Sequence, residues 1–226
     1  MGAMTTPVPG GRRIRGLDAE QRRAQRRDQL LTAAFDLFAR DGYVNTSIEQ
    51  ICQTAYVGNK AFYELFDSKE DCFLALLNQI GDRLKGEVEA ELGRSAPDEP
   101  GELTVRRVAT TFAHVLVDDP RVAVVAFREC TGISPQVESR RQENRRWAAA
   151  FIEAFWRSKA PPDDNADYRA MAVATVGGVF ELIADFLHAT EPPRSIDELA
   201  NDLTSFVLAV GHGIHYAGPA RPSRAG

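Results

Sequence analysis

A chain of 226 residues can bury a full hydrophobic core, either as one large domain or as a small domain joined to a larger one. Its net charge of −5 argues against a protein that coats nucleic acid with its whole surface. Residues 1–70 carry 10 basic and 9 acidic side chains, whereas residues 71–226 carry 17 and 23, so the basic part lies at the front.

The N-terminal segment is rich in arginine. Within the first thirty residues seven arginines face only three acidic side chains: Arg12, Arg13, Arg15, Arg22, Arg23, Arg26 and Arg27 against Asp18, Glu20 and Asp28. Such an arm, predicted over residues 1–18, can follow phosphates or enter a minor groove. The alternative for the first three arginines is a solvated tail that contacts nothing.

After the arm, periodicity and capping patterns predict three helices. Periodicity predicts a helix over about 19–40 with Leu30, Ala34, Leu37 and Phe38 on its buried side. Thr46 and Glu49 form a capping-box pattern, which predicts that the second helix begins at Thr46. Ser68 and Asp71 repeat the pattern and open a longer helix that reaches about residue 92.

Only a short element, residues 59–66, fits between those two helix starts. It carries Phe62 and Phe66 on one face, while Asn59, Lys60 and Tyr63 fall largely on another. A short helix that has an exposed polar face and follows a capped helix across a tight turn is typical of a helix-turn-helix, whose usual partner is the major groove.

The side chains of this region suit DNA. Asn pairs with adenine, Lys reaches guanine acceptors, a small apolar side chain contacts a thymine methyl, and Tyr, Lys and capped helix N-termini bind phosphate. The predicted DNA contacts are Thr46, Ser47, Tyr56, Asn59, Lys60, Ala61, Tyr63 and Lys69.

The rest of the chain is predicted to form helices separated by loops. Helices are predicted over about 105–116, 122–127, 134–159, 166–189 and 195–216. The fold class is therefore all-α: an N-terminal three-helix domain with the helix-turn-helix, and a C-terminal helical bundle for ligand binding and dimerisation. The predicted divisions are the arm 1–18, the DNA-binding domain 19–67, the effector and dimerisation domain 68–217, and a tail 218–226.

The last two helices are apolar around much of their circumference and contain glycines that permit close approach. A self-complementary four-helix interface between two copies would cover them, and the alternative is packing within one subunit. The predicted interface residues are Val173, Gly177, Phe180, Leu203, Phe206, Val210 and Ile214. A two-fold dimer would present its recognition helices to a palindromic operator.

An aromatic helical interior can leave a cavity for a small, mostly apolar effector. Aromatic residues at helical spacing are more often simply core. The candidate lining residues are Leu77, Ile80, Phe112, Leu116, Phe127, Trp147, Phe151, Phe155 and Phe180, with His114, Arg128 and Glu129 as polar handles. Effector binding would then move the helix that begins at Ser68 and release the operator.

Competing functions have weaker support. His212 and His215 lie three apart on the last helix and could form part of a metal site in an enzyme, but a packed histidine is far commoner there. Cys52, Cys72 and Cys130 have no metal-like spacing and are expected to be reduced thiols. We expect no metal, cofactor or catalytic residue, no membrane span, and a cytoplasmic protein. A DNA-binding regulator without a small-molecule effector stays open.

The first seventy-odd residues resemble the N-terminal domain of the TetR family of bacterial one-component repressors. The resemblance rests on LLTAAFDLFARDGY with its terminal Gly42, on TSIEQIC, and on KAFYELFDSKED. It implies DNA contacts at Thr46, Lys60, Tyr63 and Lys69, an effector cavity, and dimerisation through the last two helices. The chain departs from the family at Tyr56, where a turn glycine is usual, and at Gly58, where a serine N-cap is usual.

Overall fold

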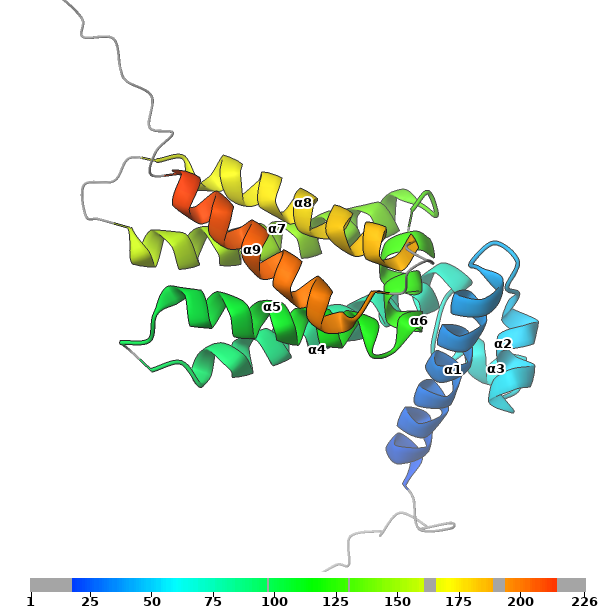
Figure 1. Cartoon of the computed structure of the whole chain (residues 1–226). Coiled ribbons are helices and arrows are strands. Elements are labelled where there is room, and N and C mark those ends of the chain that lie inside the picture. The colour runs from blue at the N-terminus through cyan, green and yellow to red at the C-terminus, as the bar shows by residue number, and fades with distance from the viewer. Residues whose placement is uncertain (1–17, 97, 130, 161–165, 189–193, 215–226) are drawn as a thin grey trace, which may run out of the picture. The chain divides into compact units, whose positions relative to one another are not determined.

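The computed structural model describes residues 18–96, 98–129, 131–160, 166–188 and 194–214, and within these ranges it contains helices and no strand (Figure 1). The all-α class is confirmed. The elements are α1 (Ala19–Asp41), α2 (Ile48–Ala55), α3 (Asn59–Tyr63), α4 (Lys69–Gly93), α5 (Gly101–Val117), α6 (Pro120–Ala123), the π-helical η1 (Val124–Glu129), α7 (Pro135–Lys159), α8 (Tyr168–His188) and α9 (Ile196–Ile214).

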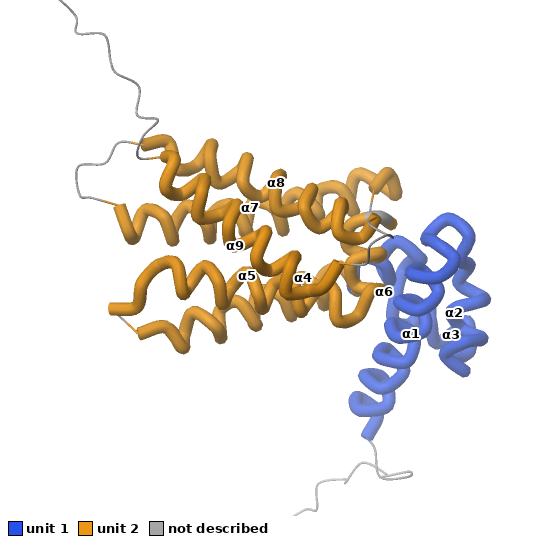
Figure 2. The backbone as a smooth tube through the Cα atoms, in the orientation of Figure 1, with its two compact units in different colours: residues 1–75 blue, residues 76–226 orange. Residues whose placement is uncertain are grey.

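The chain divides into two compact units (Figure 2). Unit 1 comprises residues 1–75 and unit 2 residues 76–226, so the division falls inside α4 and not at its first residue. Because α4 runs from Lys69 to Gly93, one continuous helix belongs to both units. Its first seven residues complete unit 1 and the remainder contributes to the bundle of unit 2.

Unit 1 is organised by an aromatic core at the end of α1. The rings of Phe38, Tyr43 and Phe73 meet at centroid distances of 5.2–5.5 Å, two of the three pairs in edge-on geometry. Gly42 ends α1 with φ of 84°, a left-handed backbone that favours glycine, and its N–H donates to Phe38 O. The predicted stop at this glycine is therefore confirmed.

The predicted start of the second helix was wrong by one residue. Ser47, not Thr46, is the N-cap of α2, and its hydroxyl accepts from Gln50 N while the Gln50 side chain accepts from Ser47 N. Thr46 is instead buried, at 2 % exposure, and its hydroxyl donates to Gly42 O at 2.8 Å. Both positions fit the capping-box pattern, and burial against the end of α1 decides between them.

In the bundle of unit 2, α5 packs against α9, α7 packs against α8, and α8 and α9 lie side by side (Figure 1). Ser134 caps α7 through its hydroxyl, which accepts from Val137 N at 3.2 Å, as its place before Pro135 suggests. The apolar run that begins at Val122 is helical, as predicted, but it continues as the π-helical η1. Such wider turns are uncommon.

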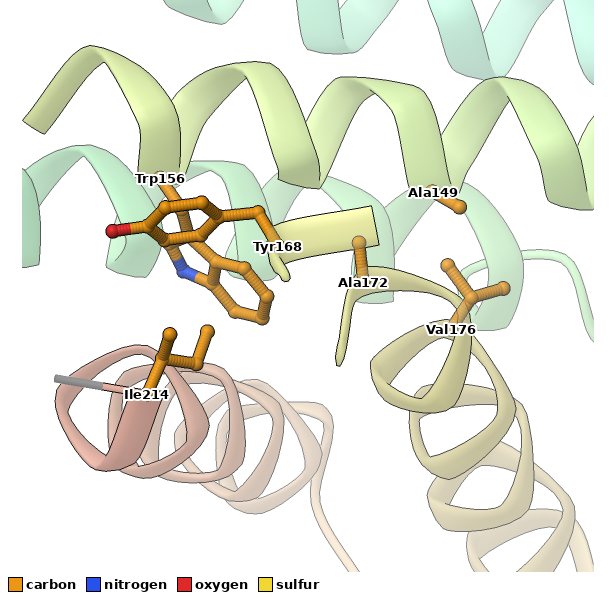
Figure 3. Packing of buried hydrophobic residues seen from close by; sticks show 6 residues of the cluster. All are labelled: Ala149, Trp156, Tyr168, Ala172, Val176 and Ile214. Atoms are coloured by element: carbon orange, nitrogen blue, oxygen red, sulfur yellow. The ribbon is translucent and has the colours of Figure 1, made fainter. Parts of the chain in front are cut away.

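Where α7, α8 and α9 converge, Trp156, Tyr168 and Ile214 pack as one buried cluster (Figure 3). Gly211 permits this contact, because a Cβ placed on it would lie 2.8 Å from the indole nitrogen of Trp156. Gly178 similarly admits the ring of Phe206, whose nearest atom would lie 2.4 Å from an added Cβ. These glycines hold the three helices close together within a single copy of the chain.

By length and composition α8 is the one helix among the described ranges that could cross a membrane. That is weak support for a span, since core helices of soluble proteins meet the same criterion. Glu181 and Asp185 lie within α8, and the helix packs against α7 and α9.

Candidate nucleic-acid interface and effector cavity

The turn between α2 and α3 is held in an unusual conformation by Tyr56. This residue caps α2 with φ of 54° and ψ of 37°, the left-handed region, and its N–H donates to Cys52 O and Gln53 O. It is the one non-glycine residue with positive φ in the described ranges. Its side chain is 97 % exposed, so packing within the chain does not offset the strain.

Replacing Tyr56 with asparagine, which tolerates the left-handed region, is expected to raise the stability of unit 1 by about 1 kcal/mol. If the ring and hydroxyl contact DNA, the same change weakens operator binding. Tyr56→Phe keeps the strain and removes only the hydroxyl. Urea unfolding and operator titration of both variants check this, and a Tyr56→Asn protein less stable than the parent would contradict the strain.

The short helix α3 separates a buried face from an exposed one. Phe62 is fully buried and Phe66 is 3 % exposed, with their ring centroids 5.4 Å apart. Asn59 and Lys60 are exposed, and Tyr63 is 59 % exposed. Gly58 is the N-cap and supplies no side-chain bond. The predicted division between a packed and a free face is thus confirmed, although α3 ends at Tyr63 and not at residue 66.

Lys69, expected to reach a phosphate, is engaged inside unit 1. Its ammonium donates to Tyr43 O and Thr46 O, both at 2.7 Å, and lies 4.3 Å from the centroid of the Tyr43 ring. Burial lowers the pKa of Lys69. The first residue of α4 therefore fastens the α1–α2 turn: two donors of the Lys69 ammonium are bonded to its carbonyls, and the Thr46 hydroxyl is buried and bonded to Gly42 O.

Two of the N-terminal arginines also have partners within unit 1. Arg23 donates to Glu64 O at 3.1 Å, which satisfies a carbonyl at the C-terminal end of α3. Arg27 lies 5.4 Å from the centroid of the Phe66 ring. Both side chains thus contact residues at or just beyond the C-terminal end of α3, contacts that sequence periodicity did not reveal. Arg12, Arg13 and Arg15 lie outside the described residues.

Unit 2 contains an apolar cavity of about 110 Å³. Side chains from α4, α5, α7, α8 and α9 line it, and Thr104 is the one polar residue among them. The lining residues are Val88, Leu92, Thr104, Val105, Val108, Ala109, Phe112, Trp147, Ala148, Phe151, Ile152, Phe155, Val176, Val179, Phe180, Leu203 and Val207.

Five of the nine predicted lining residues face this cavity: Phe112, Trp147, Phe151, Phe155 and Phe180. Leu77, Ile80, Leu116 and Phe127 do not, and Phe127 instead packs against the Phe180 ring at 4.8 Å. The sequence analysis did not predict that Val105, Val108 and Ala109 of α5 line the cavity. Their helical spacing on one apolar face of α5 could have indicated this part of the wall.

Two of the predicted polar handles, His114 and Glu129, are not among the residues that line the cavity. His114 pairs with Asp118 on the same helix, with 2.9 Å between Nδ1 and the carboxylate. The side chain of Arg128 lies outside the described residues, and Glu129 has an interaction partner.

An ion-pair network lies beside the cavity residue Thr104. Arg107 donates to Glu91 at 2.7 Å, to Ser95 at 2.6 Å, and also to Glu99. Thr104 Oγ1 donates to Glu99 at 2.9 Å. Hydrogen bonding from Arg107 lowers the pKa of Glu99. At Glu91, burial acts to raise the carboxyl pKa, but hydrogen bonds from Arg107 and Arg94 outweigh burial, so the pKa of Glu91 is lowered as well.

Replacing Arg107 with glutamine is expected to make unit 2 less stable at neutral pH and no less stable in acid. Depressed carboxyl pKa values stabilise the folded state above the ordinary Glu value of 4.5, and that contribution disappears as pH falls through the lowered folded values. Thermal unfolding from pH 7 to pH 3 measures it. Arg106→Gln, which loses only a bond to Asn201, is the control without pH dependence. A loss of stability in Arg107→Gln that is the same at pH 7 and pH 3 would contradict the stabilising role of these ion pairs.

The remaining titratable groups form no metal site in the described ranges, where no group of three His, Cys, Asp or Glu could hold an ion. His212 has a carboxylate neighbour that the sequence did not reveal, Glu102 of α5 at 4.0 Å. His215 and Cys130 lie outside the described residues. Cys52 and Cys72 are buried and free, and burial raises the pKa of Cys72 to about 12.

The proposed dimer residues divide into three groups by burial. Leu203 is 2 % exposed and lines the cavity, and Ile214 is 4 % exposed in the Trp156 cluster, so their assignment to an intersubunit surface was wrong. Val173 is 57 % exposed and Gly177 is exposed on α8. The other three, Phe180, Phe206 and Val210, are partly buried.

Comparison with known proteins shows which family the N-terminal part of the chain is similar to. Residues 30–76 match the family model described as bacterial regulatory proteins, tetR family. The HTH-type transcriptional regulator TcmR of Streptomyces glaucescens is 33 % identical over 97 residues, 42 % of this chain and 39 % of that protein. The HTH-type transcriptional activator FasR of Mycolicibacterium smegmatis is 30 % identical over 131 residues, 58 % of this chain and 57 % of that protein. The matches thus span less than two thirds of either relative.

Solved structures share the fold over more of the chain. The fatty acid degradation regulator FadR of Bacillus halodurans superposes with a TM-score of 0.71 at 16 % identity, over 81 % of this chain and 94 % of that one. FadR of Bacillus subtilis, solved with stearoyl-CoA, gives 0.69 at 16 % identity over 81 % and 98 %. A TetR-like transcriptional regulator of Rhodococcus sp. RHA1 gives 0.66 at 22 % identity over 83 % and 96 %.

Proposed function

With its helix-turn-helix matched over residues 30–76, this chain is a TetR-family transcriptional regulator, and we propose that it is a ligand-responsive repressor. In this proposal a cytoplasmic homodimer binds a palindromic operator and is released by a small, mostly apolar effector. The matched relatives are regulators of transcription, and no enzymatic activity is proposed.

The division of α3 into two faces supports DNA recognition most directly. Phe62 and Phe66 hold the helix to unit 1, which leaves Asn59, Lys60 and Tyr63 free to enter a major groove. We assign Asn59 and Lys60 to base edges, Ala61 to a thymine methyl, and Tyr63 with the exposed Ser47 and Tyr56 to the DNA backbone. Thr46 and Lys69 are left out, because their polar atoms are bonded within the unit.

Dimerisation is supported by the apolar surface left on α8. Val173 and Gly177 are exposed, and Met171 on the same helix is 37 % exposed. A second copy that covers this surface by two-fold symmetry would place two α3 helices about 34–36 Å apart, or a multiple of a DNA turn. The operator is then expected to contain two inverted half-sites.

Release of the operator is proposed to pass through α4. This helix carries Lys69, which fastens the α1–α2 turn in unit 1, and Val88 and Leu92, which line the cavity in unit 2. An effector that binds better when α4 is displaced would weaken operator binding by about 5 to 150-fold, corresponding to a coupling of about 1–3 kcal/mol.

Replacing Lys60 with alanine tests the recognition face. If Lys60 contacts guanine, each half-site loses about 1–3 kcal/mol of discrimination, so affinity for the operator falls while affinity for random DNA changes little. Titration of both duplexes by fluorescence anisotropy measures the ratio. Lys159→Ala, which removes an exposed lysine from unit 2, is the control. An equal loss for both duplexes would remove Lys60 from base recognition.

A further inference from the structure

The cavity of unit 2 has an almost uniform lining. Aromatic rings of Phe112, Trp147, Phe151 and Phe180 form much of its wall, and aliphatic side chains form the rest. The rings of Trp147 and Phe151 are stacked with 5.8 Å between their centroids and 15° between their planes, so the two lie nearly parallel. Thr104 is the one lining residue with a side-chain hydroxyl.

The basic side chains near this wall lie over aromatic rings or are bonded to carboxylates. Lys85 lies 5.6 Å from the Trp147 ring centroid, and Arg145 lies 4.4 Å from that of Phe180. Arg107 is bonded to two carboxylates, and the Thr104 hydroxyl donates to one of them. No charged side chain is among the lining residues. An anionic or cationic group enclosed by these lining residues would therefore lose its hydration without gaining a charged partner among them.

The volume sets the size of the occupant. At about 110 Å³ the cavity is smaller than the roughly 300–1,000 Å³ typical of sites for drug-sized ligands. It is closer to the engineered apolar cavity of about 150 Å³ in another protein, which stays dry and binds benzene. One aromatic ring is thus the scale of molecule that fits without rearrangement.

We infer that the cavity binds a neutral, monocyclic aromatic compound, or the neutral aryl part of a slightly larger one. Flat rings along α7 and α8 favour offset or edge-on contacts with an aromatic guest, worth about 0.5–1.5 kcal/mol beyond the burial of apolar area. The inference rests on the proposed function only in taking this compound as the effector. Binding itself is measurable without DNA.

Thermal unfolding of the full chain with toluene, benzoate or octanoyl-CoA tests the inference. Near-saturating toluene is expected to raise the unfolding midpoint by about 2–4 °C, because a ligand that binds only the folded state stabilises it. Benzoate, which differs by one charged group, is expected to leave the midpoint unchanged, as is octanoyl-CoA.

Cavity-filling variants locate the binding. Ala109→Leu places a larger side chain into the cavity and is expected to abolish the toluene shift, while Ala150→Leu, at an exposed position on α7, is expected to keep it. Ala148→Leu serves as the second filled variant if Ala109→Leu does not fold. A shift that persists in the filled variants, or an equal shift with benzoate or octanoyl-CoA, would overturn the inference.

Operator binding is titrated separately with the same preparations. A protein that binds its operator but shows no toluene shift contradicts the ligand class and leaves the regulator proposal intact. A protein that shows the shift but selects no operator contradicts the proposed function and leaves the cavity chemistry intact.

Discussion

Replacing Phe62 with alanine is expected to unfold much of unit 1 and abolish operator binding. Phe62 is fully buried, and its ring meets those of Phe66 at 5.4 Å and Tyr63 at 5.6 Å. Truncation of a buried phenylalanine costs about 3–5 kcal/mol. A five-residue helix has little stability of its own, so α3 depends on this anchor.

The two units can be followed separately in a urea titration. Both tryptophans of the chain, Trp147 and Trp156, belong to unit 2, so their fluorescence reports that unit, whereas circular dichroism reports both. Phe62→Ala is expected to bring an early transition in circular dichroism that fluorescence does not share. Tyr63→Ala, at the neighbouring exposed position, should weaken DNA binding and leave unfolding unchanged. A Phe62→Ala protein within about 1 kcal/mol of the parent would contradict the packing of α3.

Replacing Lys69 with methionine is expected to destabilise unit 1 by about 2 kcal/mol, because hydrogen bonds from a charged donor contribute about 1.5–3 kcal/mol each and part of this site is open to water. Methionine keeps most of the apolar stem over the Tyr43 ring but cannot donate to Tyr43 O or Thr46 O. Operator affinity should fall with the loss of order in the α1–α2 turn.

The salt dependence of DNA binding separates this structural role from a phosphate contact. A lysine that neutralises a phosphate lowers the slope of log affinity against log salt by about one when it is removed. For Lys69→Met we expect an unchanged slope together with lower stability. Lys60→Met, at an exposed position, provides the matched comparison. A reduced slope with unchanged stability would restore Lys69 to the phosphate interface.

The sequence predicted local structure correctly where neighbouring residues allowed only one arrangement. Phe62 and Phe66 lie four apart and could share only one face of a helix, so the packed side of α3 was predictable. Gly42 and Ser134 ended and began helices as their types suggest. Thr46 and Ser47 both fit a capping box, and only the burial of Thr46 beneath the α1 terminus distinguishes them.

Partners distant in sequence were not predictable. Lys69 reaches carbonyls more than twenty residues away, and Arg23 reaches one 41 residues away, contacts that no periodicity encodes. Periodicity likewise identified the apolar sides of α8 and α9 but not which neighbour covers each. Leu203 therefore turned inward to the cavity, while Val173 stayed exposed.

Selection of genomic DNA fragments by the purified protein at moderate salt tests the proposed regulator most directly. The account predicts an enriched duplex with two inverted half-sites, centred about one helical turn or a multiple apart, which binds two copies of the chain. The same duplex should lose its preference over random DNA with Lys60→Ala. Recovery of no sequence above random DNA, from a protein whose two units are folded, would contradict operator recognition by α3.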